Sequence, residues 1–100
     1  MKEILPNEVN VLLKGNLPVH IIDVREVDEL KAGKIPNALN IPLGLVEFRM
    51  QDLDISKEYI MVCRSGGRSS MAAQLLEDHG YNVLNMMGGM NEWEGPTEKF

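Results

Sequence analysis

The fold of this chain is decided by one stretch, Tyr59-Ile60-Met61-Val62-Cys63-Arg64-Ser65-Gly66-Gly67-Arg68, in which five apolar residues lead directly into a polar loop. Strands that are buried on both faces of a parallel sheet are apolar throughout, and residues 59–63 have this character. Residues 68–79 then repeat apolar side chains at helical spacing, and the glycine that follows predicts the end of a helix. The order of buried strand, glycine loop and helix is typical of an α/β protein.

Strands and helices are predicted to alternate along the rest of the chain. Runs of β-branched and apolar residues predict further strands over 19–24, 38–41 and 81–86. Helical patterns occupy 6–14, 26–32 and 43–52, and a last short helix contains Trp93. In the helix over 26–32, Val27 and Leu30 are the residues expected to be buried. This alternation indicates a mainly parallel sheet with helices on both faces, and such sheets bind ligands beyond the carboxyl ends of their strands.

Length and composition restrict the class of protein. One hundred residues, of which 44% are hydrophobic and 25% charged, predict one globular domain over residues 1–100. A single cysteine excludes a disulfide scaffold, and apolar runs of at most five residues exclude a membrane-spanning helix. The net charge of −5 argues against a protein that binds nucleic acid through phosphate contacts. The N-terminus lacks the apolar stretch of a signal peptide, so we expect a cytoplasmic protein with a reduced thiol.

The loop over residues 63–68 combines features that favour a reactive thiolate. Unpaired N–H groups at a helix N-terminus attract negative charge, and Gly66 and Gly67 allow successive N–H groups to point at one anion. Arg64 and Arg68 add permanent positive charge on either side. The alternative is structural, because a lone cysteine at the end of a core strand is usually a small buried hydrophobe. Two arginines and two glycines beside the cysteine favour a site that binds an anion or performs catalysis.

Neither a metal nor a cofactor is expected. His20 and His79 are far apart in the sequence, and with one cysteine they do not have the spacing of a zinc site. The two glycine pairs, Gly66-Gly67 and Gly88-Gly89, lack the surrounding pattern of a P-loop or a dinucleotide fingerprint.

Three ordered motifs resemble the single-domain rhodanese family of sulfurtransferases. The first runs over residues 22–26 and 33–42, which read Ile-Asp-Val-Arg-Glu and Gly-Lys-Ile-Pro-Asn-Ala-Leu-Asn-Ile-Pro. The second is the loop over 63–69, and the third comprises 80–83 together with 87–93, which ends at the tryptophan. Lys34, Leu30 and Asn37 depart from residues that are common in the family, and all three lie outside the loop. The resemblance covers nearly the whole chain and implies a five-stranded parallel sheet between helices.

The resemblance also implies roles for particular residues. Cys63 would be the catalytic nucleophile, which takes sulfane sulfur from thiosulfate or another persulfide donor and passes it to a thiol, cyanide or a protein. Asp23 and Arg25 would brace the loop from the neighbouring strand end, although an ordinary surface ion pair is the alternative. The residues expected to bind the anionic donor are Arg64, Ser65, Gly66, Gly67 and Arg68.

Two other functions are weighed against sulfur transfer. Phosphatases that share this fold need five residues between cysteine and arginine, whereas four lie between Cys63 and Arg68, so the loop length favours sulfur over phosphate. The fold also serves as a non-enzymatic binding or redox-sensing module. Binding-only relatives commonly lose the cysteine, and the intact loop therefore favours an enzyme.

Overall fold

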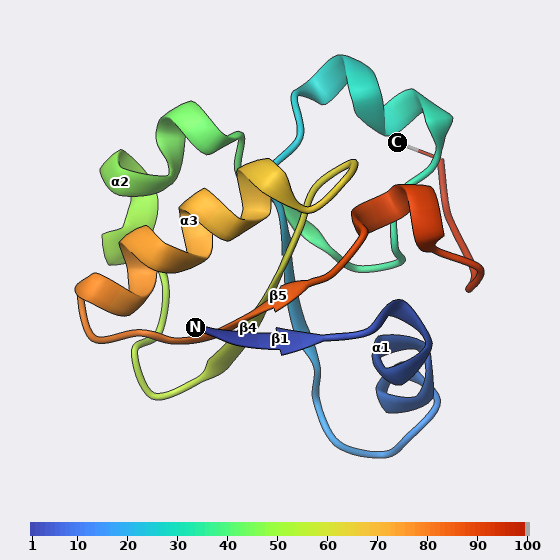
Figure 1. Cartoon of the computed structure of the whole chain (residues 1–100), viewed down its shortest axis with the longest axis horizontal. Coiled ribbons are helices and arrows are strands. Elements are labelled where there is room, and N and C mark those ends of the chain that lie inside the picture. Colours follow the sequence, from blue (N-terminus) through green and yellow to red (C-terminus); the bar gives the residue numbers. More distant parts are fainter. Residues whose placement is uncertain (100) are drawn as a thin grey trace.

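A five-stranded parallel sheet forms the centre of the molecule. The computed structural model describes residues 1–99, so the last residue of the predicted domain lies outside the described residues. The strands are β1 (Lys2–Ile4), β2 (His20–Asp23), β3 (Leu39–Asn40), β4 (Glu58–Val62) and β5 (Asn82–Met86). They lie in the order β1-β5-β4-β2-β3, and every neighbouring pair is parallel. The predicted α/β class and the five-stranded parallel sheet are confirmed (Figure 1).

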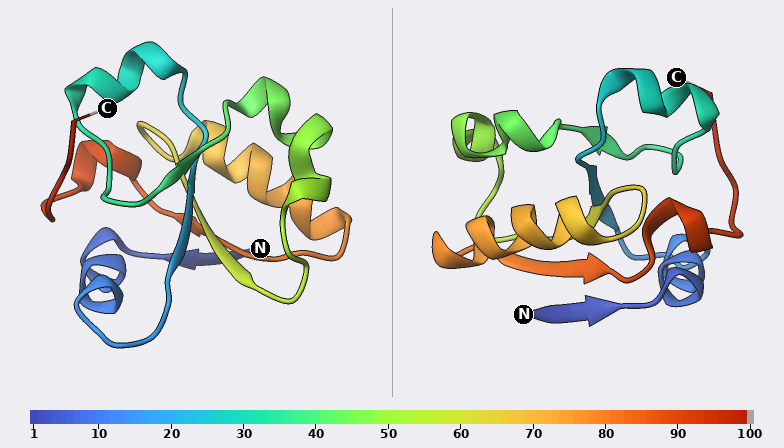
Figure 2. Two further views of the ribbon diagram at one scale, coloured as in Figure 1. Left: turned by 180° about the vertical axis from the view of Figure 1, so that it is seen from behind. Right: turned by 45° about the horizontal axis from the view of Figure 1, so that its top comes forward.

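Helices cover both faces of the sheet (Figure 2). The α-helices are α1 (Pro6–Leu13), α2 (Val46–Arg49) and α3 (Gly67–Asp78). Four short 3-10 helices are η1 (Val27–Ala32), η2 (Leu43–Leu45), η3 (Met50–Asp52) and η4 (Gly89–Glu92). No helix within residues 1–99 is both long enough and apolar enough to cross a membrane.

The side chains of β4 alternate between two cores. Tyr59 and Met61 point into the core beneath α2 and α3, whereas Ile60 and Val62 point into the core that contains Val9 of α1. Side chains of successive strand residues point to opposite faces, so a strand covered on both faces must be apolar at every position. This double coverage explains the unbroken apolar run that predicted the strand.

Three local features differ from the sequence predictions. Strand β1 was not among the segments predicted as strands, because it has three residues, two of them exposed, at the edge of the sheet. Val27 is 47% exposed although Leu30 is fully buried, since Val27 opens η1 next to exposed neighbours. Trp93 follows η4 as its C-terminal cap rather than lying inside it.

The segment after η4 folds back onto the chain that follows η1. Lys34 and Glu98 form an isolated antiparallel bridge, and the Nζ atom of Lys34 lies 2.9 Å from the carboxylate of Glu98. Lys34 is buried, and its Nζ atom also donates to the carbonyl oxygen of Ile35 at 3.3 Å. The lysine that departs from the family pattern thus fixes the last described residues against the body of the molecule.

Candidate active site

Cys63 lies at the carboxyl end of the central strand β4. The register pairs Asp23 of β2 with Val62, so β2 and β4 end at the same edge and Cys63 emerges beside the Asp23–Arg25 segment. The loop continues over residues 64–66, and α3 begins at Gly67 (Figure 1). Cys63 is 1% exposed and is a free thiol. Asp23 and Arg25 therefore lie at the same edge of the sheet as Cys63, the edge at which parallel sheets bind ligands.

Hydrogen-bond donors surround the sulfur of Cys63. The Gly66 N–H donates to Sγ at 3.0 Å, and the Ser69 hydroxyl donates to it at 3.3 Å. Burial raises the pKa of the Cys63 thiol, but hydrogen bonds from the side chain and backbone of Ser69 and from the backbone of Gly66 and Ser65 outweigh burial. The pKa of Cys63 is therefore below its ordinary value, which favours the nucleophilic thiolate.

Replacing Ser69 by alanine should raise the pKa of Cys63, because Sγ loses its side-chain donor. The pKa is read from the ultraviolet absorbance of the thiolate as a function of pH, which does not require a reagent to enter the buried site. The reaction of Cys63 with a sulfur donor should slow as pH falls through this pKa, and Ser69→Ala should move that decline to higher pH. Ser70→Ala is the matched control, and equal curves for both variants would contradict the role of the Ser69 hydroxyl.

The two glycines of the loop have different conformations. Gly66 has a φ of +104°, and a Cβ atom there would lie 3.3 Å from the backbone nitrogen of Gly88. Gly67 is the first residue of α3, and a Cβ atom there would meet no atom within 4 Å. Only Gly66 therefore needs the left-handed backbone that glycine adopts without strain, and this conformation turns its N–H toward Sγ.

Segments close to the C-terminus hold the loop in place. The N–H groups of Met90 and Asn91 donate to the carbonyl oxygens of Cys63 and Arg64 at 2.8 and 2.9 Å. The Nδ2 atom of Asn85 donates to the carbonyl oxygen of Gly66 at 3.2 Å. Asn85 is only 4% exposed, so this contact fixes the loop from inside the protein.

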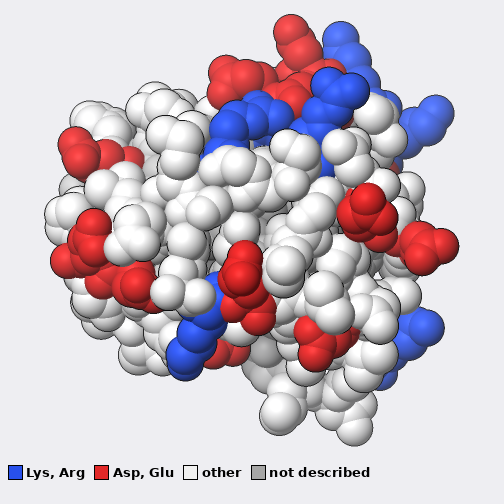
Figure 3. Space-filling model, viewed as in Figure 1, with Lys and Arg blue, Asp and Glu red and all other residues white. Residues whose placement is uncertain are grey.

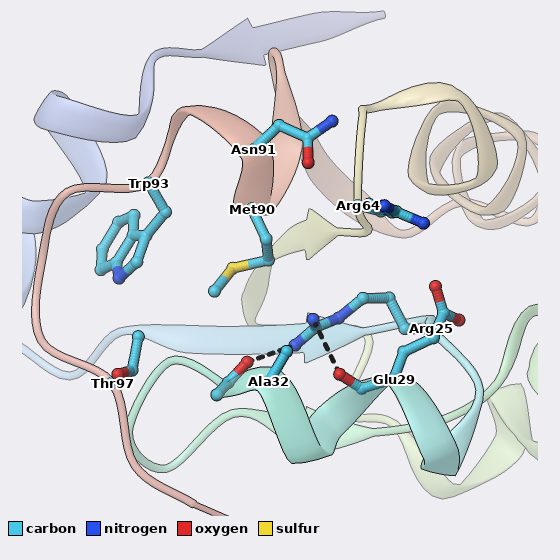
Figure 4. A pocket seen from close by; sticks show the side chains of 9 residues that line it. Arg25, Glu29, Ala32, Arg64, Met90, Asn91, Trp93 and Thr97 are labelled. Carbon is cyan, nitrogen blue, oxygen red and sulfur yellow. Dashed lines mark hydrogen bonds between the residues drawn. The ribbon is translucent and has the colours of Figure 1, made fainter.

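Asp23 and Arg25 form a buried pair that supports η1. The Nη2 atom of Arg25 lies 2.8 Å from Oδ2 of Asp23 and donates to the carbonyl oxygen of Gly33 at 2.9 Å. Its Nη1 atom donates to the carbonyl oxygen of Glu29 at 3.4 Å (Figure 4). These side-chain contacts reach the middle of η1 and the residue that caps its C-terminal end, and η1 in turn contacts the loop through Glu29.

The side chain of Arg68 pairs with Glu29. Its Nη1 and Nη2 atoms each donate to one carboxylate oxygen of Glu29 at 2.7 Å. These hydrogen bonds from Arg68 are the largest influence on the Glu29 carboxyl and hold its pKa at about 2. Arg64, in contrast, is exposed and has no ion pair among residues 1–99.

A pocket of about 500 Å³ opens beside the loop. Arg64 and Asn91 line one side of it, Arg25 and Glu29 line another, and Trp93 closes the far end (Figure 4). Its lining combines charged groups with apolar surface. Pockets of this size accommodate small organic molecules.

Comparison with known proteins identifies the family. The sequence profile described as "Rhodanese-like domain" matches residues 5–96. YtwF of Bacillus subtilis, named as a candidate sulfurtransferase, is 38% identical over 98 residues, which cover 98% of this chain and 95% of that protein. A protein of Allochromatium vinosum named sulfurtransferase is 34% identical over 94 residues, covering 93% and 88% of the two chains. The crystal structure of a rhodanese-like domain protein from Staphylococcus aureus gives a TM-score of 0.94 at 34% identity and covers 100% of this chain and 99% of that chain. This chain belongs to the rhodanese-like family.

The structure separates the predicted site residues into two groups. Gly66 and the backbone of Ser65 lie against the sulfur of Cys63, and Ser69 joins them. The side chains of Arg64 and Arg68 instead point to the pocket and to Glu29, respectively.

Sequence reasoning missed three residues around the loop, namely Glu29, Asn85 and Gly89. A signal was available for two of them. Glu29 lies on the predicted helix over 26–32, four residues after Arg25, and Asn85 is a polar residue within a predicted apolar strand.

Proposed function

We propose that this protein is a sulfurtransferase that carries sulfane sulfur on Cys63 as a persulfide. The observation that supports this most directly is the position of Sγ at the end of β4, 3.0 Å from the Gly66 nitrogen and 3.3 Å from the Ser69 oxygen. Donors placed around a sulfur stabilise the thiolate before the reaction and the charge on the outer sulfur afterwards. We treat residues 1–100 as one rhodanese-like domain, which acts in a reducing cytoplasm where its lone thiol stays free.

The reaction consists of two displacements at sulfur. The Cys63 thiolate attacks the outer sulfur of thiosulfate or another persulfide donor, a bond forms between Sγ and that sulfur, and the donor's sulfur–sulfur bond breaks. With thiosulfate, sulfite leaves with the electron pair. A thiophilic acceptor (a thiol, a protein, or cyanide in the laboratory) then attacks the outer sulfur of the persulfide, and Cys63 leaves as the thiolate. The sulfur atom is transferred without an added oxidant or reductant.

The remaining predicted residues take supporting roles in this proposal. The N–H groups of residues 64–68 surround the transferred sulfur, and the exposed charge of Arg64 attracts the donor. Asp23 and Arg25 keep η1 in place and thereby brace the loop. The predicted donor-binding set is Arg64, Ser65, Gly66, Gly67 and Arg68.

Loading of sulfur onto the purified protein tests the proposal. Protein treated with thiosulfate should gain the mass of one sulfur atom on Cys63, and cyanide should remove it, because Cys63 is the only thiol in the chain. Intact-protein mass spectrometry before and after each treatment measures both steps. If thiosulfate, polysulfide and mercaptopyruvate all fail to load the protein, the enzyme is excluded and a binding or redox-sensing module replaces it.

A further inference from the structure

The Glu29–Arg68 pair joins the loop to a residue that lines the neighbouring pocket, and it points to a determinant of donor choice. We propose that Glu29 selects for singly charged sulfur donors with an apolar group and against the doubly charged thiosulfate, by neutralising Arg68. This inference rests on the proposed sulfurtransferase function. Glu29 would be a specificity-determining residue that acts through Arg68.

The contacts of Glu29 hold its carboxylate in one position. Each of its two oxygens accepts a hydrogen bond from Arg68 at 2.7 Å, and Oε2 also accepts the N–H of Glu26 at 2.7 Å. Its backbone carbonyl oxygen accepts from Arg25. A bidentate pair between a guanidinium and a carboxylate is strong and has a fixed geometry. Arg68 is therefore held by Glu29 and does not offer its charge freely to an incoming anion.

Pairing leaves little net positive charge around the pocket. Arg25 is matched by Asp23, and Arg68 is matched by the pocket residue Glu29. Arg64 is therefore the one arginine in the lining that has no carboxylate partner among the described residues. Figure 3 shows the same mixing at the surface, where the Lys and Arg side chains near the top of the view lie among acidic ones. A dianion therefore gains from only one uncompensated cation here, Arg64.

The walls of the pocket suit an organic group. The pocket of about 500 Å³ is far larger than an inorganic thiosulfate ion requires. Met90, Trp93 and Ala32 provide apolar surface in its lining (Figure 4). Burial of an apolar group against such surface contributes binding free energy that thiosulfate cannot obtain. The geometry therefore favours organic thiosulfonates and organic persulfides as the donor class.

Variants that remove the charge of Glu29, of Arg68 or of both test the inference. For each variant kcat/KM is measured with two donors, thiosulfate and benzenethiosulfonate. Both donate a sulfane sulfur, but the second carries one negative charge and a phenyl ring. Unmodified protein should have the higher kcat/KM for benzenethiosulfonate. Glu29→Gln should raise kcat/KM for thiosulfate by about three- to tenfold, mainly through KM, since it releases the charge of Arg68. Arg68→Ala should lower it by a similar factor, because the carboxylate is left unpaired.

The double variant distinguishes charge from structure. Glu29→Gln combined with Arg68→Ala restores a locally neutral pair of side chains and should return thiosulfate kcat/KM to near the unmodified value. The same series should change benzenethiosulfonate kcat/KM much less. Asp28→Asn removes the same charge from an exposed position on η1 and is the matched control, expected to leave both donors unaffected.

Each outcome decides between charge selection and a structural role. If all three pair variants lose activity with both donors, the pair only holds η1 to α3 and the inference is wrong. Unmodified protein that prefers thiosulfate would also overturn it. If Glu29→Gln does not fold, Arg68→Ala and the double variant still test the expected ranking, in which the double variant has the higher kcat/KM for thiosulfate. The proposed function itself is contradicted if unmodified protein loads sulfur from neither probe and also fails with polysulfide and mercaptopyruvate. Loading of sulfur without the expected dependence on charge contradicts only the role of Glu29.

Discussion

Replacing Cys63 by serine should abolish sulfur transfer, with a loss of at least about a thousandfold in the rate of sulfite release from thiosulfate. Serine fits the same space but has a hydroxyl that is far less acidic and less nucleophilic than a thiol. The donors around Sγ cannot compensate, because they stabilise a charge that the hydroxyl does not form at neutral pH. Single-turnover measurement of sulfite release, together with the absence of added mass, checks this expectation.

The control for Cys63→Ser is a separate variant in which serine replaces another sulfur-containing side chain. Met71 lies on α3 and is 64% exposed, so Met71→Ser should leave sulfite release unchanged. Thermal unfolding of Cys63→Ser should resemble that of the unmodified protein, which separates loss of the nucleophile from loss of the fold. Sulfite release by Cys63→Ser at a rate near that of the unmodified protein would show that another group accepts the sulfur.

Replacing Gly89 by alanine should both destabilise the protein and inactivate it. A Cβ atom at this position would lie 2.5 Å from the carbonyl oxygen of Cys63 and 2.6 Å from the carbonyl carbon and oxygen of Arg64. These are backbone atoms that cannot rotate away, and the φ of +58° adds strain for any residue with a side chain. We expect a loss of roughly 2–4 kcal/mol in the free energy of unfolding. Displacing the loop should also remove the donors from Sγ, so sulfite release should fall with stability.

Gly44 provides the matched control for a glycine replacement. A Cβ atom at Gly44 would meet no atom within 4 Å, so Gly44→Ala should leave stability unchanged or raise it by up to about 1 kcal/mol. Denaturant unfolding of both variants measures the difference between them. A stable and fully active Gly89→Ala protein would show that the contact between the turn at residues 88–89 and the loop is dispensable.

The sequence predicts the elements of this fold well where the pattern is local. The unbroken apolar run of β4 and the helical repeat of α3 each depend on burial of one short segment, and burial determines residue type directly. Strand β1 escapes prediction because its three residues carry no pattern of their own and gain their partners only from β5. The sequence also cannot show that Gly66 has a positive φ and Gly67 does not, because both positions are simply glycine in the sequence.

The candidate site is predictable only in its sequence-local part. Cys63 and the residues that immediately follow it form one motif, so their proximity follows from the chain itself. Glu29 lies 39 residues before Arg68, and Asn85 lies 19 residues after Gly66. Such contacts follow from the order of the strands in the sheet, which brings η1 and the end of β5 to the edge where the loop lies. The sequence therefore predicts the candidate nucleophile, Cys63, but not the carboxylate that pairs with Arg68.

The pairing of β1 with β5 has a consequence for synthesis of the chain. Lys2 pairs with Leu84, so one edge of the sheet stays open until the last strand has left the ribosome. Because η4 follows β5, the N–H groups of Met90 and Asn91 reach the loop later still. A nascent chain that ends before these residues can form the β2–β4 pair, but it lacks the two hydrogen bonds that hold the backbone of Cys63 and Arg64. The thiol thus acquires its final surroundings only after η4 has been synthesised, well after Cys63 itself has been added to the chain.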